Sequence, residues 1–218
     1  MTSTDFARNR HDLSQYLVHF TTDRQPCCSD GDNPATKAEI AGTTAQARLI
    51  SILQQKKVLA TKMPWVNRNA VCFTECPWPS LVDHARAYSP YGVGFTKPHV
   101  FAAGGGPAFY VRADLYRKQT WDAHLLTFVT PFMPPYAPKV KIEGGLPGGK
   151  VVDYTHEREW RTPHDFSFEF DQVAFVVVDS YNDVATWPKD LKDAIGRDRF
   201  LIMDVYRQIE TLWPIHRV

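Results

Sequence analysis

The 218-residue chain contains no apolar run of the roughly 18–20 residues that a membrane-spanning helix needs. Residues 1–15 lack the apolar segment of a secretory signal, so we expect a cytoplasmic protein with no membrane partner. The formal net charge is only +1, which excludes a strongly basic protein but leaves room for a local basic groove. The remaining composition, 44% hydrophobic and 22% charged, predicts one globular domain spanning residues 1–218.

Cysteine is also scarce. Cys27 and Cys28 are adjacent, while Cys72 and Cys76 form a lone CxxxC. Structural zinc sites usually contain two CxxC-like pairs, so the sequence predicts no metal site. We expect free thiols in a reducing cytoplasm, with the side chain of Cys72 packed against one face of a strand.

Internal repeats, coiled-coil heptads and low-complexity tracts are absent from the sequence. Short β-branched and aromatic runs predict strands at Tyr16–Thr21, Val71–Thr74 and Val173–Val178. Apolar residues at helical spacing predict a helix through Leu49–Leu53, and a segment rich in proline and glycine predicts a flap-like loop at Pro131–Lys150. Because strands and helices alternate without regular βαβ spacing, the predicted fold class is α+β.

The first predicted strand carries a histidine. Side chains alternate along a strand, so His19 and Thr21 share one face while Val18 and Phe20 share the other. If Val18 and Phe20 face the apolar core, His19 and Thr21 lie on a polar face. A single histidine in a strand is more often structural than functional, so a role in chemistry requires a second motif.

That second motif is DYTHEREWR, at Asp153–Arg161. In an extended conformation Glu157, Glu159 and Arg161 share one face, with the two carboxylates roughly 6–7 Å apart. Two ionised carboxylates at this spacing repel, which raises the pKa of one of them unless a cation compensates. The alternative is a solvated charged turn in which one glutamate pairs with an arginine. In either case we expect neither glutamate to be buried in the core.

Three motifs, taken in order, resemble those of ADP-ribosyltransferases. They are His-x-Thr at His19–Thr21, Phe-Thr-x-Cys-Pro at Phe73–Pro77 and Glu-x-Glu at Glu157–Glu159. The resemblance implies an ADP-ribosyltransferase-like fold, in which two small mixed or antiparallel sheets and surrounding helices form a cleft for NAD. It also implies that the second glutamate of Glu-x-Glu binds the 2′-hydroxyl of the nicotinamide ribose, and that the first glutamate serves the acceptor.

The chain also resembles bacterial abortive-infection proteins of the AbiGi-like group and, more distantly, the DarT DNA ADP-ribosyltransferases. Segments such as VCFTECP, YGVGF and EREWR carry this resemblance across Tyr16–Arg161. Arg68 takes the place of an arginine that precedes a strand in DarT-like enzymes. The chain departs from that pattern in two ways. No second histidine follows His19, and Tyr91 and Tyr110 both compete for the position of the tyrosine that stacks on nicotinamide.

The resemblance therefore implies a set of site residues. The implied catalytic residues are Glu159, Glu157 and His19. The implied NAD-binding residues are His19, Phe20, Thr21, Arg68, Phe73, Thr74, Tyr91 and Tyr110. NAD is then the substrate, and the chemistry needs no metal.

The expected acceptor is a macromolecule. RNA or DNA is slightly favoured over protein, because arginine and lysine residues alternate with aromatic residues near the expected site. The resemblance further implies a phage-defence or toxin–antitoxin effector. Two alternatives stay open: a non-catalytic antitoxin or binding module on the same fold, and an NAD glycohydrolase whose acceptor is water. The presence of His19, Glu157 and Glu159 favours catalysis over a binding module.

Overall fold

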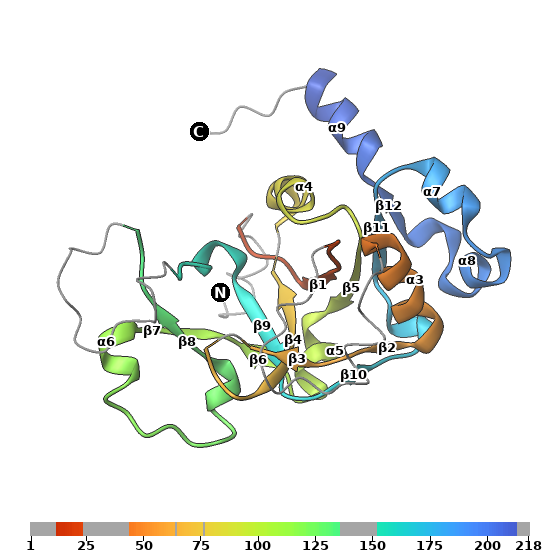
Figure 1. Cartoon of the computed structure of the whole chain (residues 1–218). Helices are drawn as coiled ribbons and strands as arrows, with labels where there is room; N and C mark the ends of the chain where they lie inside the picture. Colours follow the sequence, from red (N-terminus) through yellow and green to blue (C-terminus); the bar gives the residue numbers. More distant parts are fainter. Residues whose placement is uncertain (1–11, 24–43, 64, 76, 136–151, 213–218) are drawn as a thin grey trace, which may run out of the picture.

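A computed structural model describes residues 12–23, 44–63, 65–75, 77–135 and 152–212 of the chain (Figure 1). The strands in chain order are β1 (Tyr16–Phe20), β2 (Lys57–Val58), β3 (Thr61–Lys62), β4 (Asn69–Thr74), β5 (Gly92–Thr96), β6 (Gly106–Pro107), β7 (Phe109–Arg112), β8 (Val129–Phe132), β9 (Glu159–Thr162), β10 (Phe166–Ser167), β11 (Phe175–Val178) and β12 (Phe200–Ile202). The α-helices are α3 (Ala45–Gln55), α4 (Trp78–Ala87), α5 (Lys97–Ala102), α6 (Ala113–Tyr116), α7 (Tyr181–Thr186), α8 (Lys189–Ile195) and α9 (Met203–Leu212). The short 3-10 turns are η1 (Leu126–Phe128), η3 (Thr155–Glu157), η4 (Phe170–Gln172) and η5 (Arg197–Arg199).

One mixed sheet of eight strands organises the fold. Seven strands follow the order β12-β11-β5-β1-β4-β9-β6, and β3 adds to β4 outside this path. Pairing in this sheet is antiparallel except between β11 and β12. Two further two-stranded sheets, β10-β2 and β7-β8, stand apart from it. The predicted α+β class is confirmed, although the strands form one large sheet with two small ones rather than two small sheets of similar size.

The register of three adjacent strands defines the two faces of the large sheet. Val18 of β1 lies opposite Thr74 of β4, which lies opposite Glu159 of β9. Directly opposed residues point to the same side, so we call the side of these three residues the second face. Leu17 and Phe95, which are also paired, lie on the first face.

Helices cover both faces. On the first face, Leu17 and Phe95 belong to a buried cluster with residues of α3, α5 and α8. On the second face, Val18 packs with residues of α4 and with Met203 of α9. Figure 1 shows α4 above β1 and β5, with α3 and α8 on the right. Burial of this apolar area, at about 25 cal/mol per Å², is the main term that stabilises the arrangement.

Strands β1 and β4 separate soon after they meet. Their described pairing consists of Val18 with Thr74, whereas β1 and β5 pair along Tyr16–Phe20. The edge of β4 that faces β1 therefore has backbone groups that do not pair with β1. The side chain of His19 reaches across this separation, as described below.

The predicted loop at Pro131–Lys150 begins differently from the prediction. Its first two residues belong to β8, where Pro131 pairs in parallel with Val111 of β7. Met133 then forms an isolated bridge with Val152. The remainder of the predicted flap, from residue 136 to residue 150, lies outside the described residues.

Candidate active site

An ion pair between Glu159 and Arg161 is the centre of the site. The two residues are two apart on β9 and therefore share the second face, as the sequence predicts. Nε of Arg161 donates to Oε1 of Glu159 at 2.8 Å, and Nη2 donates to Oε2 at 2.5 Å. Burial lowers the pKa of the guanidinium, but its hydrogen bonds and charge interaction with Glu159 outweigh this effect and raise the pKa.

The Arg161 side chain has no solvent exposure. Its remaining donors are satisfied by the carbonyl oxygens of Thr127 and Val129 and by Oγ1 of Thr130, at 2.9, 3.4 and 2.6 Å. The Trp65 ring lies 5.3 Å from the guanidinium carbon, within range of a cation–π contact. A buried charge with this many partners holds a single orientation, so Arg161 fixes the carboxylate that it binds.

The expectation that neither glutamate is buried is wrong for Glu159, which is 7% exposed. Glu159 is the first residue of β9, the strand that lies between β4 and β6, and its side chain is buried there. The carboxylate accepts two hydrogen bonds from Arg161 and interacts with the Cys72 thiol, which leaves lone-pair capacity on its two oxygens. Glu159 can therefore accept a hydrogen bond from a ligand while its ion pair remains intact.

Glu157 is placed differently from its predicted position on an extended strand. It is the last residue of η3. Arg158, the next residue, adopts left-handed backbone angles (φ 44°), so the extended strand begins only at Glu159. The amide of Glu75, just after β4, donates to the Glu157 carbonyl at 3.1 Å and fastens η3 to the sheet. This bond holds Glu157 beside the start of β9, because Thr74, which precedes Glu75, pairs with Glu159.

The two carboxyl groups have distinct electrostatic environments. Burial, and to a smaller extent the negative charge of Glu159, raises the pKa of Glu157. The Tyr88 hydroxyl donates to Oε1 of Glu157 and opposes this rise. One carboxylate is thus bound to a buried cation, and the other binds a proton more readily than an ordinary glutamate. Such a division of environments is typical of a site with one electrostatic group and one proton-transfer group.

Cys72 and Tyr110 complete this cluster. Cys72 lies opposite Arg161 on β4, so it shares the second face, and the residue is exposed to solvent rather than packed as predicted. Loss of water around the thiol, followed by the negative charge of Glu159, raises the pKa of the thiol well above its usual value. Burial also raises the pKa of Tyr110, whose hydroxyl donates to the Tyr154 carbonyl at 2.9 Å. We call this group the carboxylate site; its residues are Cys72, Tyr88, Tyr110, Glu157, Glu159 and Arg161.

The two tyrosines that competed in the sequence lie in different places. The amide of Ala108, two residues before Tyr110, donates to the Glu159 carbonyl at 2.7 Å, and the charge of Glu159 contributes to the raised pKa of Tyr110, which belongs to the carboxylate site. Tyr91 instead donates to Asp183 of α7 at 3.0 Å, and burial raises its pKa. Tyr91 therefore lies near the end of β1 and α7, away from the two glutamates, whereas Tyr110 lies beside Glu159.

His19 does not lie on the same side of the sheet as Glu159. It pairs with Val93 of β5 and points to the first face with Leu17, so the predicted polar face is in fact partly covered by the main core. Its Nδ1 lies 2.8 Å from the Cys72 carbonyl, at the point where β1 and β4 separate. Burial lowers the pKa of His19. The histidine thus contacts the backbone of the carboxylate site, while its ring lies on the opposite face.

Thr21, predicted beside His19, has a structural environment. It is 5% exposed, and its hydroxyl lies 2.7 Å from the Ala45 carbonyl and 3.1 Å from the Tyr91 carbonyl. These contacts connect the end of β1 to the start of α3 and to β5. A ligand that used this hydroxyl would have to displace a buried hydrogen bond.

The other predicted NAD-binding residues are divided between the two faces. Phe73 is buried among aromatic rings of the first face. Thr74 is buried beside Glu159 on the second face. Phe20 also points to the second face, where its ring centre lies 4.6 Å from that of His84 in α4.

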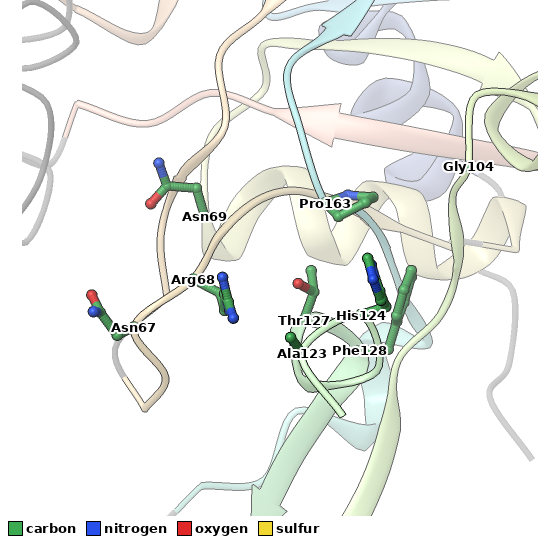
Figure 2. Close-up of a pocket in the computed structure, with 9 residues that line it drawn as sticks. All are labelled: Asn67, Arg68, Asn69, Gly104, Ala123, His124, Thr127, Phe128 and Pro163. Carbon is green, nitrogen blue, oxygen red and sulfur yellow. The ribbon is translucent and has the colours of Figure 1, made fainter. Parts of the chain in front are cut away.

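Arg68 lies at the other end of β4 from the carboxylate site. Thr74 is six positions further along the chain, which corresponds to about 20 Å of extended chain. The exposed Arg68 side chain lines a pocket of about 610 Å³, shown in Figure 2. The predicted NAD-binding arginine is therefore separate from the two glutamates.

Sequence reasoning missed His84 and Tyr88. Both lie at the end of α4, with their ring centres 4.4 Å apart. Burial, with a smaller effect of His156, lowers the pKa of His84 to about 4. Helical spacing of four residues was the available signal, because it places both rings on one side of α4. Contact with Glu157 could not be read from spacing, since it depends on how α4 packs against η3.

No family model matches the chain, and neither a curated protein nor a solved structure matches it. Among the described residues, no group of three or more His, Cys, Asp and Glu side chains is arranged to hold a metal ion. Cys27, Cys28 and Cys76 lie outside the described residues. No helix in the described part of the chain is long and apolar enough to cross a membrane.

Proposed function

We propose that the protein is an ADP-ribosyltransferase that cleaves NAD at the carboxylate site. The observation that carries this proposal is the unequal pair of glutamates: Glu159 is bound by a buried arginine, and Glu157 has a raised pKa. The order of His-x-Thr, Phe-Thr-x-Cys-Pro and Glu-x-Glu in the sequence supports the same reaction. His19 and Arg68 lie apart from the two glutamates, so the proposed chemistry is assigned to Glu157 and Glu159.

Glu159 has the properties required of an electrostatic stabiliser. When the N-glycosidic bond of NAD breaks, nicotinamide leaves with the bonding electron pair and positive charge develops on the ribose. A carboxylate that accepts a hydrogen bond from the ribose 2′-hydroxyl stabilises this charge. Arg161 holds the carboxylate in place before the reaction, so little reorganisation is needed when the charge appears.

Glu157 has the properties required of a proton acceptor. The incoming nucleophile donates an electron pair to the ribose carbon and releases a proton, which the Glu157 carboxylate can accept. Its raised pKa increases its basicity toward the range in which general bases are efficient. The phenol of Tyr88 keeps the carboxylate oriented.

The acceptor is a macromolecule in this proposal, with RNA or DNA ahead of protein. The support is compositional: lysine and arginine residues alternate with aromatic residues in the sequence around the site. Transfer to water would give the same cleavage of NAD without a modified macromolecule.

Incubation of the purified chain with NAD labelled in its ADP-ribose part tests the proposal. Parallel reactions contain RNA, DNA, a mixture of proteins, or no acceptor. We expect label on a nucleic acid and release of nicotinamide in equal amount. Label on protein would change the acceptor class, and free ADP-ribose alone would identify a glycohydrolase. Intact NAD in every reaction would contradict catalysis and favour the binding module.

A further inference from the structure

The pocket beside Arg68 is distinct from the carboxylate site. It lies between the turn that precedes β4 and the segment that leads into η1 (Figure 2). Pro163, which follows the last residue of β9, lines it, whereas Glu159 is the first residue of that strand. The two sites therefore lie toward opposite ends of β9, and Thr127 separates them, because its carbonyl binds Arg161 while the residue also lines the pocket.

The lining of this pocket carries positive charge and amide groups. Its described lining residues are Asn67, Arg68, Asn69, Gly104, Ala123, His124, Thr127, Phe128 and Pro163, with no acidic residue among them. Figure 2 shows Arg68 on one side of the space and His124 on the other. The nearby Asp122 carboxylate accepts from the His124 backbone amide at 2.8 Å and is not one of the lining residues.

Arg68 is the key residue, because it has no ion-pair partner among the residues that the structure describes. Several other arginines, including Arg112, Arg158, Arg161 and Arg197, pair with a carboxylate. A guanidinium presents a planar set of donors that matches an oxyanion, and phosphate is the common biological example.

The size and remaining chemistry of the pocket define the ligand further. A volume of about 610 Å³ lies within the roughly 300–1,000 Å³ range of small-molecule sites. The half-buried Phe128 offers an aromatic ring, while the side chains of Asn67 and Asn69 point away from it in Figure 2. A lone phosphate would leave the Phe128 ring unused, whereas a nucleotide has a base face that can stack on it.

We infer that this pocket is a second ligand site, which binds the phosphate and base of one nucleotide unit. Arg68 binds the phosphate, with His124 opposite it, and Phe128 contacts the base. The nucleotide can be free or can be the end of a nucleic-acid strand. The inference does not depend on NAD cleavage, because none of its residues belongs to the carboxylate site.

Calorimetric titration of the full chain tests this site. The probes are inorganic phosphate, AMP and a short 5′-phosphorylated oligonucleotide, each titrated into wild type, Arg68→Gln and a control, Arg197→Gln. The control also removes one exposed arginine charge, but from η5. We expect AMP to bind more tightly than phosphate, and Arg68→Gln to weaken AMP binding by about tenfold or more, the loss typical of a charge-assisted contact. Arg197→Gln should bind as wild type does.

The oligonucleotide distinguishes the two sources of the nucleotide. Tighter, Arg68-dependent binding of the oligonucleotide than of AMP assigns the pocket to a strand end, and the reverse order assigns it to a free nucleotide. Unchanged AMP binding in Arg68→Gln, no AMP binding in wild type, or AMP binding no tighter than phosphate would overturn the inference. AMP that entered the NAD site instead would keep its affinity in Arg68→Gln, which is the first of these three outcomes. If the wild-type chain does not cleave NAD but still binds AMP through Arg68, the proposed function is refuted and the second site is not.

Discussion

A single buried arginine determines the character of the candidate site. Arg161 is fully buried, and its donors are distributed between the Glu159 carboxylate and acceptors in the η1–β8 segment. Removal of one partner from a buried ion pair commonly costs about 3–5 kcal/mol, because the other charge is left without compensation. Stability and catalysis therefore depend on the same residues, and experiments on Glu159 must measure both.

His84 provides a test of the environment around the site. Its pKa of about 4 in the folded protein lies below its ordinary value of 6.5, so the unfolded chain binds more protons between these values. Stability should therefore rise from about pH 4 to pH 6.5 by an amount on the order of 3 kcal/mol from this residue. His84→Gln should remove that part of the rise. Chemical denaturation of both proteins across this pH range measures it, and parallel stability curves would contradict the buried neutral histidine.

Tyr88 controls the titration of Glu157. Its hydroxyl donates to the carboxylate, and this hydrogen bond lowers a pKa that burial raises. Tyr88→Phe should therefore raise the pKa of Glu157 further. Because the base must be deprotonated, the acidic limb of the transfer rate should move to higher pH. The measurement is the pH profile of transfer for wild type and Tyr88→Phe; a profile that keeps its shape and only loses height would show that Tyr88 acts on folding alone.

At the scale of elements, sequence patterns predicted strands better than they predicted faces. β1, β4 and β11 lie within about two residues of their predicted positions, because β-branched and aromatic runs specify extended chain locally. The face of His19 was predicted wrongly. Alternation gives relative orientation only, and both faces of this sheet carry an apolar cluster, so the exposed side could not be read from β1 itself.

The carboxylate site was also predictable in part. Glu159 and Arg161 share a face because they are two residues apart on one strand, and this spacing can be read from the sequence. The displacement of Glu157 into η3 depends on the left-handed conformation of Arg158, which no residue preference predicts. The predicted packing of Cys72 was wrong, because the apolar clusters on the second face cover Ala70 at one end of β4 and Val18 of β1 beside its other end, and neither includes Cys72. These features depend on contacts between segments distant in the chain.

Close packing between two strands of the large sheet gives a prediction at this scale. A Cβ atom at Gly94 of β5 would lie 2.6 Å from ring atoms of Phe175 in β11. Gly94→Ala should therefore destabilise the protein by about 1–3 kcal/mol, the usual cost of overpacking. Gly106→Ala is the matched control, because the nearest atom to its Cβ would be 3.5 Å away, an ordinary contact. Urea denaturation of both variants measures the difference, and equal stability of the two would contradict the packing at Gly94.

At the scale of the whole molecule, the fold places two candidate sites toward opposite ends of β9. The carboxylate site lies on the second face near the start of the strand, and the Arg68 pocket lies beyond its end. A formal net charge of +1 gives no general attraction for nucleic acid, so recognition of a nucleotide has to come from local groups such as Arg68. The proposed chemistry and the proposed nucleotide site can therefore be tested independently.

The central claim is that the Glu159 carboxylate stabilises charge on the ribose of NAD. The most direct measurement is NAD cleavage per folded molecule for wild type, Glu159→Gln and Thr130→Val. Thr130→Val is the matched control, because it removes another buried partner of Arg161 and leaves the carboxylate intact. Both variants should lose stability, and denaturation curves supply the folded fraction.

We expect Glu159→Gln to reduce cleavage by about 10²–10³-fold or more at unchanged NAD affinity, because the charge that it stabilises exists only in the transition state. Thr130→Val should remain within about threefold of wild type once folded protein is counted, since its carboxylate is retained. Undiminished cleavage by folded Glu159→Gln, or an equal loss in both variants, would show that Glu159 serves only to pair a buried arginine and would contradict its catalytic role.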